Sequence, residues 1–197
     1  MKPIDAEQAR DHLELVDRIL AESQQRLCAG GEFFVVWGLF SAIVTVLSHL
    51  IGAGLAPAAT GWVLPPLLAA AVAFSIVRGR RLRELRGRES LVQREFFNVL
   101  WLTLGLAVVA NVGIYRIFSG MASAAIWSFS EAIVLLYIGM HGNRRAQIAG
   151  VLVIVSMVVA NFAAPQNVAY VLAAGMVLGY GGFGLAELLA RDRETGS

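Results

Sequence analysis

The residue with the clearest potential for chemistry is Glu131, a carboxyl group in the middle of a long apolar stretch. The nineteen residues from Ala122 to Met140 contain no other side chain that is charged near neutral pH, and nine of them lie on each side of the acid. A carboxylate at the centre of a bilayer costs roughly 2.5–3.5 kcal/mol and usually faces a bundle interior or a watery cavity. Removal from water disfavours the charged form, so we expect the neutral acid near pH 7.

Other polar residues can be grouped by their expected depth in a membrane. Counting from each expected helix start, four residues come to the level of Glu131: Ser41, Thr45, Ser156 and Tyr180. A second group is expected at the outer rim: His49, Asn111, Arg116 and Asn161. In a structural interpretation, neutral Glu131 donates a hydrogen bond to one of the four and ties helices together. In a functional one, it binds a proton, a cation or a cationic ligand in a cavity that opens outward past Asn111 and Arg116. The sequence leaves both open.

Several other chemistries are not expected. The sequence contains no HExxH, no Cys/His pair at zinc spacing, no G-x-S-x-G and no Walker loop. The Gly-rich run at 179–184 lies inside an apolar segment with no strand before it, and Gly175 and Gly179 are spaced for close helix approach. Cys28, the single cysteine, has no His or acid placed to activate it. We therefore expect no enzyme, no cofactor and no metal site.

The elements that must position these residues are predicted to be membrane-spanning helices. The chain has 197 residues, of which 57% are hydrophobic and only 15% charged, whereas a soluble domain is about a quarter charged. Six apolar segments can cross a bilayer: residues 33–53, 60–77, 96–115, 122–140, 148–163 and 167–189. The expected fold class is an all-α polytopic membrane protein with six transmembrane helices as three hairpins. An amphipathic cytoplasmic helix and membrane entry (1–31) come before the transmembrane domain (32–190), and a cytoplasmic tail (191–197) follows it.

The distribution of positive charge predicts the orientation. Fifteen of the sixteen Lys and Arg residues fall on one side of the predicted membrane, and only Arg116 falls on the other. By the positive-inside rule both termini are cytoplasmic. We expect a multi-pass protein of a bacterial inner membrane, without a cleavable signal peptide. The tryptophans near helix ends are interpreted as interfacial anchors.

Two cytoplasmic features could make contacts. Leu13, Val16, Leu20 and Leu27 form the apolar face of the N-terminal helix. One alternative is that this face rests on its own bundle or on lipid headgroups; the other is that it docks a protein partner or a second copy of the chain. The Arg-rich stretch after residue 77, which includes Arg80, Arg81 and Arg83, is expected to meet the anionic lipids of the inner leaflet. No nucleic acid is expected, because no aromatic residues are interleaved among the charges.

Short repeats suggest related hairpins, since "EFF" begins both the first and the third apolar segment, at Glu32 and Glu95. From Phe33 to Leu189 the chain resembles, in architecture, the small bacterial acid-resistance membrane proteins of the HdeD type, which implies three two-helix hairpins with cytoplasmic ends. "GGEFFVVWG" after an amphipathic helix is similar to a group of uncharacterised bacterial six-helix proteins. The N-terminal helix is additional to the HdeD pattern, and no site residue is transferred from either group.

The function expected from these patterns is that of a non-enzymatic membrane protein. Its cytoplasmic features are substantial and its outer connections short, which favours a regulatory or accessory subunit that acts through protein or lipid contacts. The alternative is a small proton- or cation-linked transporter or channel that uses Glu131.

Overall fold

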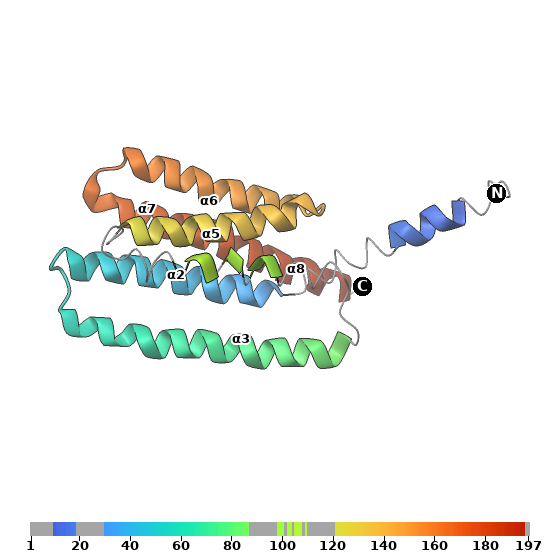
Figure 1. Ribbon diagram of the computed structural model, residues 1–197, viewed down its shortest axis with the longest axis horizontal. Helices are drawn as coiled ribbons and strands as arrows, with labels where there is room; N and C mark the ends of the chain where they lie inside the picture. The colour runs from blue at the N-terminus through green and yellow to red at the C-terminus, as the bar shows by residue number, and fades with distance from the viewer. Residues whose placement is uncertain are drawn as a thin grey trace.

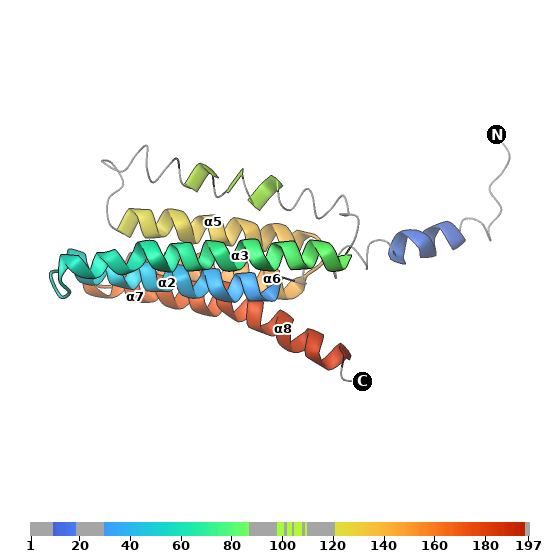
Figure 2. The ribbon, with the colours of Figure 1, turned by 90° about the horizontal axis from the view of Figure 1, so that it is seen from below.

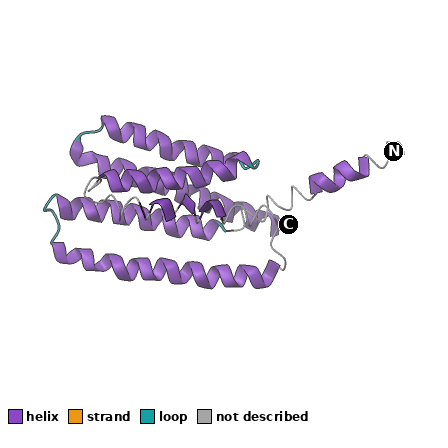
Figure 3. Ribbon diagram, viewed as in Figure 1, coloured by secondary structure: helices purple, strands orange, loops and turns teal. Residues whose placement is uncertain are grey.

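The described residues form helices joined by loops and turns (Figure 3). The computed structural model describes residues 10–18, 30–86, 98–100, 102–103, 105–107, 109 and 121–195, and none of these residues forms a strand. Four helical stretches are long and apolar enough to cross a membrane: Gly31–Gly52, Ala58–Arg81, Arg144–Phe162 and Pro165–Ala190. The prediction of an all-helical protein suited to a membrane is confirmed at this level.

Short connections join α2 to α3, α5 to α6 and α6 to the C-terminal helix (Figure 1). Residues 10–18 form a separate helix, and the described residues between 98 and 109 are also helical. In chain order, the elements of the bundle are α2 (Gly31–Gly52), the 3₁₀ turn η1 (Ala58–Val63), α3 (Leu64–Arg86), α5 (Met121–Met140), α6 (Arg144–Phe162), the 3₁₀ turn η2 (Pro165–Asn167), α7 (Val168–Gly175), the π-helical segment η3 (Met176–Gly181) and α8 (Gly182–Thr195). The last four form one unbroken C-terminal helix.

Some helix limits differ from those expected. The second predicted helix, 60–77, continues as α3 to Arg86, because arginine favours a helix and nothing in "RGRRLREL" ends one. The fifth, 148–163, begins earlier, at Arg144. The reason is an N-cap: the Asn143 side chain accepts a hydrogen bond of 3.1 Å from the backbone N–H of Ala146. The last helix extends beyond residue 189 to Thr195.

The two ends of the bundle differ in charge. The connections at residues 53–57 and 163–167 lie at one end, and the connection at 141–143 lies at the other, where α3 and α8 also end (Figure 1). Every arginine of the bundle whose side chain is described is at this second end: Arg78, Arg80, Arg81, Arg144 and Arg145. The fold therefore gathers the basic residues as the charge pattern of the sequence predicted.

The C-terminal helix is the centre of the bundle. Of the four candidate spans it is the most buried, and it packs against α2 on one side and against α6 on another (Figure 2). Glycines make both contacts close. A Cβ atom built at Gly38 of α2 would lie 2.7 Å from the backbone nitrogen of Gly181, and one at Gly179 would lie 2.5 Å from Cγ2 of Val153 on α6. Small residues at such points bring backbones close enough for dense packing in lipid.

The predicted hairpins are neighbours along the chain, but of the two whose helices are both described only the third, α6 with the C-terminal helix, is a main packing unit. The principal partner of α2 is the C-terminal helix rather than α3, and the most extensive contact of α5 is with α6, across the connection at 141–143. Of the candidate spans, α3 buries the least. Sequence repeats identify which helices are connected, whereas burial depends on which faces fit together.

The outer faces of the bundle are apolar. Along the middle of α6, from residue 148 to residue 159, the exposed residues are all aliphatic: Ile148, Val151, Leu152, Val155, Val158 and Val159. Trp62, at the start of the α3 span, is 80% exposed, as expected of an interfacial anchor. A continuous apolar surface of this length is what a lipid-facing helix presents.

Candidate functional site in the middle of the bundle

The structure brings Glu131 together with two of its four candidate partners. Glu131 lies on α5 and is only 8% exposed. Ser41, on α2, lies close enough for its hydroxyl to influence the carboxyl group of Glu131. Tyr180, on η3, lies close enough for its phenol to be influenced by the charge on Glu131. Three segments far apart in the sequence therefore meet at one acid.

The carboxyl group of Glu131 is only partly satisfied. Its Oε2 atom is buried and has no hydrogen-bond partner, and it is the one side-chain nitrogen or oxygen in this condition within the described part of the chain. Nearly all buried polar atoms in proteins have a partner, so an exception of this kind calls for an explanation such as a bound proton, ion or water.

The neighbouring helices hold Tyr180 and Ser41 in place by packing. The ring of Phe34 lies 5.0 Å from that of Tyr180 and 4.9 Å from that of Phe183, measured between centroids. Gly38, one turn before Ser41, lets α2 come against the backbone of η3. The site is thus built on helix faces rather than on connecting segments, which fixes its geometry.

Two buried serines beside Glu131 were not predicted. Ser128 and Ser130 lie on α5 and are 0% and 7% exposed. Their hydroxyls donate to the carbonyl oxygens of Ala124 and Ile126, at 3.0 Å and 2.9 Å. The signal in the sequence was that Ser128, three residues before Glu131, shares its helix face. Because both hydroxyls donate their hydrogen bonds to backbone carbonyl oxygens of α5, they do not donate to the carboxyl group of Glu131.

Thr45 and Ser156 were expected at the same site but lie elsewhere. The Thr45 hydroxyl is directed to the sulfur of Met176, at 3.6 Å. The Ser156 hydroxyl donates to the carbonyl oxygen of Val153, at 2.7 Å, and its side chain faces Gly175. Counting residues along a helix gives height only. Whether a side chain faces a given neighbour depends on its angle around the helix, and this was not fixed by the depth argument.

The outer-rim group is only partly described. The ring of His49 packs edge-on against Tyr170 of α7, with centroids 5.7 Å apart, and Asn161 is exposed near the end of α6. Asn111 and Arg116 lie outside the described residues, and so does the outward cavity expected beside them.

At the arginine-rich end, polar groups are paired between helices. Arg78 of α3 donates from Nε and Nη2 to the two carboxylate oxygens of Glu32 on α2, at 2.7 Å and 2.5 Å. Trp37 donates from Nε1 to the Ser75 hydroxyl at 3.0 Å, so it joins α2 to α3 and is not simply an interfacial anchor. These pairs escaped the sequence analysis, because the predicted hairpin of these two helices did not fix which of their faces meet.

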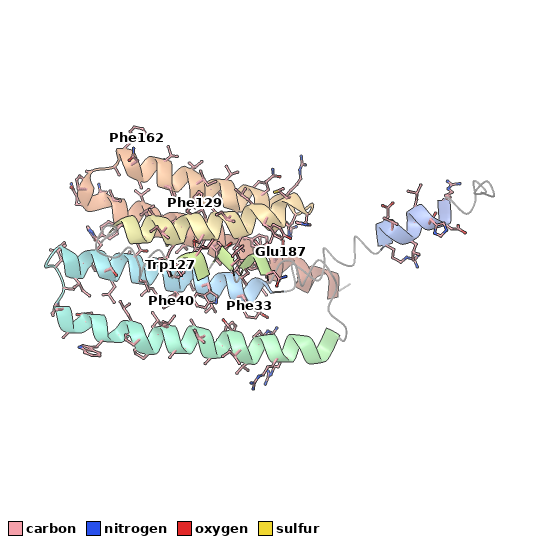
Figure 4. The ribbon with its side chains drawn as sticks, in the orientation of Figure 1. Phe33, Phe40, Trp127, Phe129, Phe162 and Glu187 are labelled. Atoms are coloured by element: carbon pink, nitrogen blue, oxygen red, sulfur yellow. The ribbon has the colours of Figure 1, made fainter. Side chains whose placement is uncertain are left out.

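A second polar contact lies at the same end, where α5, α6 and α8 meet. The Asn143 amide donates to Oε1 of Glu187, at 3.3 Å, and Arg145 is 3.7 Å from the same oxygen. Figure 4 shows Glu187 on this side of the bundle, while the labelled rings of Phe129 and Phe162 lie on α5 and α6. These pairs stabilise the end of the bundle and contribute nothing to the mid-depth site.

The predicted contact residues are exposed where they are described. Leu13 is 66% and Val16 50% exposed on the helix of residues 10–18. Arg80 and Arg81 are exposed near the end of α3. Leu20, Leu27 and the side chain of Arg83 lie outside the described residues.

Comparison with known proteins adds no family to this description. No family model, curated protein or solved structure matches the chain. The resemblance to acid-resistance membrane proteins therefore stays a prediction.

Chemically, the described arrangement offers one carboxyl group and two hydroxyls. The described residues contain no group of three or more His, Cys, Asp or Glu side chains that could hold a metal ion.

Proposed function

We propose that this protein is a non-enzymatic membrane subunit with a regulatory or accessory role, which acts through contacts of its N-terminal helix. The observation that carries the proposal is the exposure of apolar side chains on the helix of residues 10–18. Leu13, Leu15 and Val16 are 66%, 54% and 50% exposed, and none of the nine residues is buried. The alternative that this helix rests on its own bundle is not seen in the described residues.

The charges of this helix favour a protein over a lipid surface as its partner. Residues 10–18 carry two arginines and three acidic residues, which gives a formal charge of 2 − 3 = −1 with His12 neutral. Helices that bind anionic leaflets carry an excess of Lys and Arg on the polar face. The exposed Arg80 and Arg81 are better suited to lipid headgroups. In this proposal the helix of residues 10–18 contacts a protein, while Arg80 and Arg81 contact the lipid headgroups of the inner leaflet.

The direction of the described helices supports six crossings with both termini in the cytoplasm. The end of α3, at Arg86, and the start of α5, at Met121, lie at opposite ends of the bundle (Figure 1). The chain between them therefore has to travel the length of the bundle an odd number of times. One crossing there, near the predicted helix 96–115, gives six in total. The gathering of arginines at one end supports an inner, cytoplasmic location for that end.

The proposal is tested by two matched double substitutions in the full chain, L13S/V16S and D11S/R18S. Each pair introduces two serines and leaves the net charge unchanged, but the first removes the apolar face and the second changes the opposite face. A photoreactive residue placed at His12, beside the apolar face, reports what that face contacts in the membrane. We expect crosslinks to protein in the wild type, loss of them in L13S/V16S, and retention in D11S/R18S.

Two copies of the chain with different tags distinguish the partners. Crosslinks between the tags mean that the partner is a second copy, and crosslinks to one other defined protein mean an accessory role in a heteromeric complex. Crosslinks to lipid alone, or protein crosslinks that survive L13S/V16S unchanged, would rule out the proposed contact surface.

A further inference from the structure

The acid at mid-depth is not held in one protonation state by its surroundings. If Glu131 is neutral, its proton needs an acceptor, yet Oε2 has no partner. If it is ionised, the carboxylate can accept about four hydrogen bonds, yet within the described residues Oε2 accepts none, and the neighbouring hydroxyls are those of Ser41 and Tyr180. Ser128 and Ser130 donate to backbone carbonyls instead. A purely structural acid is expected to have all its polar atoms satisfied, because a half-satisfied buried network is costly.

A second observation concerns the helix that carries Tyr180. From Met176 to Gly181 this helix departs from α geometry and forms a π-helical segment. Such segments are rare, and they are frequent at functional sites, because they shift one side chain out of its α-helical position. Here the segment presents Tyr180 to Glu131. Both irregular features of the bundle core, the unpartnered oxygen and the π segment, therefore meet at one point.

No charged group of the packed elements fixes the state of Glu131. From η3, the facing titratable group is Tyr180, and from α2 the facing group is Ser41, which does not titrate. The remaining titratable groups of α2, α5, α6 and α7 lie toward the ends of these helices: Glu32, His49, Tyr137, Arg144, Arg145 and Tyr170. Among the described residues, Ser41 and Tyr180 are therefore the polar groups of the neighbouring helices that face Glu131.

We infer that Glu131, Ser41 and Tyr180 form a proton-binding site inside the bundle, which takes up and releases one proton at the carboxyl group. The ligand is a proton rather than a metal ion, because hard cations need about six oxygen ligands and the described site supplies a single carboxylate and two hydroxyls. Release leaves the carboxylate with the Ser41 hydroxyl, and uptake places the proton on the otherwise unpartnered oxygen. This inference is independent of the contact surface proposed for residues 10–18.

Infrared difference spectroscopy tests the site in the full chain, reconstituted in lipid nanodiscs. The C=O stretch of a protonated carboxyl group is separate from that of a carboxylate, so a change in protonation is read directly. We expect a protonated-carboxyl band that grows as the pH is lowered and is absent in E131Q. Loss of the hydroxyl in S41A should shift the frequency of this band, since a hydrogen-bonded C=O absorbs at lower frequency than a free one. E187Q, which changes a partly buried acid outside the site, should leave it unchanged.

Each other outcome overturns the inference. A band of constant intensity at every pH means a permanently neutral, structural acid, and no band means a permanently ionised one. A band that sodium or potassium ions remove at constant pH means a metal site. If E131Q does not fold, as judged by circular dichroism and gel filtration, the assignment depends on S41A and Y180F. A titrating band that neither variant shifts would then belong to another acid.

Discussion

Single glycine residues determine how closely the helices approach one another. At Gly175, a Cβ atom would overlap both the hydroxyl and the Cβ of Ser156 on α6. The hydroxyl can rotate away, whereas Cβ cannot move without the helix. Overpacking of this kind typically costs about 1–3 kcal/mol. We therefore expect G175A to lower the unfolding temperature of the purified protein in detergent.

The overlap at Gly175 involves one side chain, so it offers a direct control. In G175A/S156G both overlapping atoms of Ser156 are removed, and we expect much of the lost stability to return. Gly52, at the end of α2, has no neighbour within 4 Å of its Cβ position, and G52A should leave the unfolding temperature nearly unchanged. If G175A unfolds at the wild-type temperature, the close approach of the two helices is not as described.

The candidate site could be predicted from the sequence only as far as height along a helix allows. Hydropathy placed Glu131 at mid-depth, and counting along the helices brought Ser41 and Tyr180 to its level, where the structure also has them. The same count included Thr45 and Ser156, which face Met176 and Gly175. The angle around the axis depends on which helices are neighbours. In addition, the π segment that contains Tyr180 shifts that angle in a way that no periodicity reveals.

Among the elements, α3 depends most on a few polar contacts. It is the least buried of the candidate spans, and it is joined to α2 by the Glu32–Arg78 pair and by the Trp37–Ser75 hydrogen bond. Helices in lipid gain no hydrophobic driving force from each other, so they are held together by close packing and by polar contacts between them. We conclude that these two contacts set the position of α3.

A double-mutant cycle on E32Q and R78Q measures the first of these contacts. Each substitution removes one charge; E32Q keeps the size of the side chain, whereas R78Q shortens it, as does the control R80Q. The pair is bidentate but about a quarter exposed, so we expect a coupling energy of about 1 kcal/mol, near the upper end for surface pairs. The measurement is the free energy of unfolding in detergent. R80Q removes an exposed arginine two residues away and should have little effect. Additive effects of E32Q and R78Q would mean that the ion pair does not hold α3.

Element boundaries could be predicted well where composition changes sharply and less well where a local contact decides. Helix α5, Met121–Met140, matches the expected 122–140. The start of α6 depended on the side-chain cap of Asn143, and the continuation of α3 through its arginines had no apolar signal. The feature that the sequence predicted least well was which helices pack most closely against one another. Hydropathy shows which faces can be buried, but the fit of glycines such as Gly38 and Gly179 against backbone selects the neighbour.

At the scale of the whole molecule, the separation of charge along the bundle predicts its orientation. The exposed connections at Leu55 and Gln166 lie at the end opposite Arg144 (Figure 1). In a C28S background, which removes the native cysteine, we introduce L55C, Q166C or R144C singly. A membrane-impermeant thiol reagent applied to the outer membrane face should label positions 55 and 166 at once. Position 144 should react only after permeabilisation. The reverse pattern would contradict the positive-inside assignment.

The same assay determines the number of crossings. Because α3 ends and α5 begins at opposite ends of the bundle, an odd number of crossings between Arg86 and Met121 places Ser90 and Ser119 on opposite sides of the membrane. We expect S90C to react like R144C, from the inside, and S119C to react like L55C, from the outside. With both on the inside, the segment 96–115 would not cross, and α5 would have to begin on the cytoplasmic side. Its connection to α6 at residues 141–143 would then be outside, together with Arg144 and Arg145, which R144C labelling tests independently.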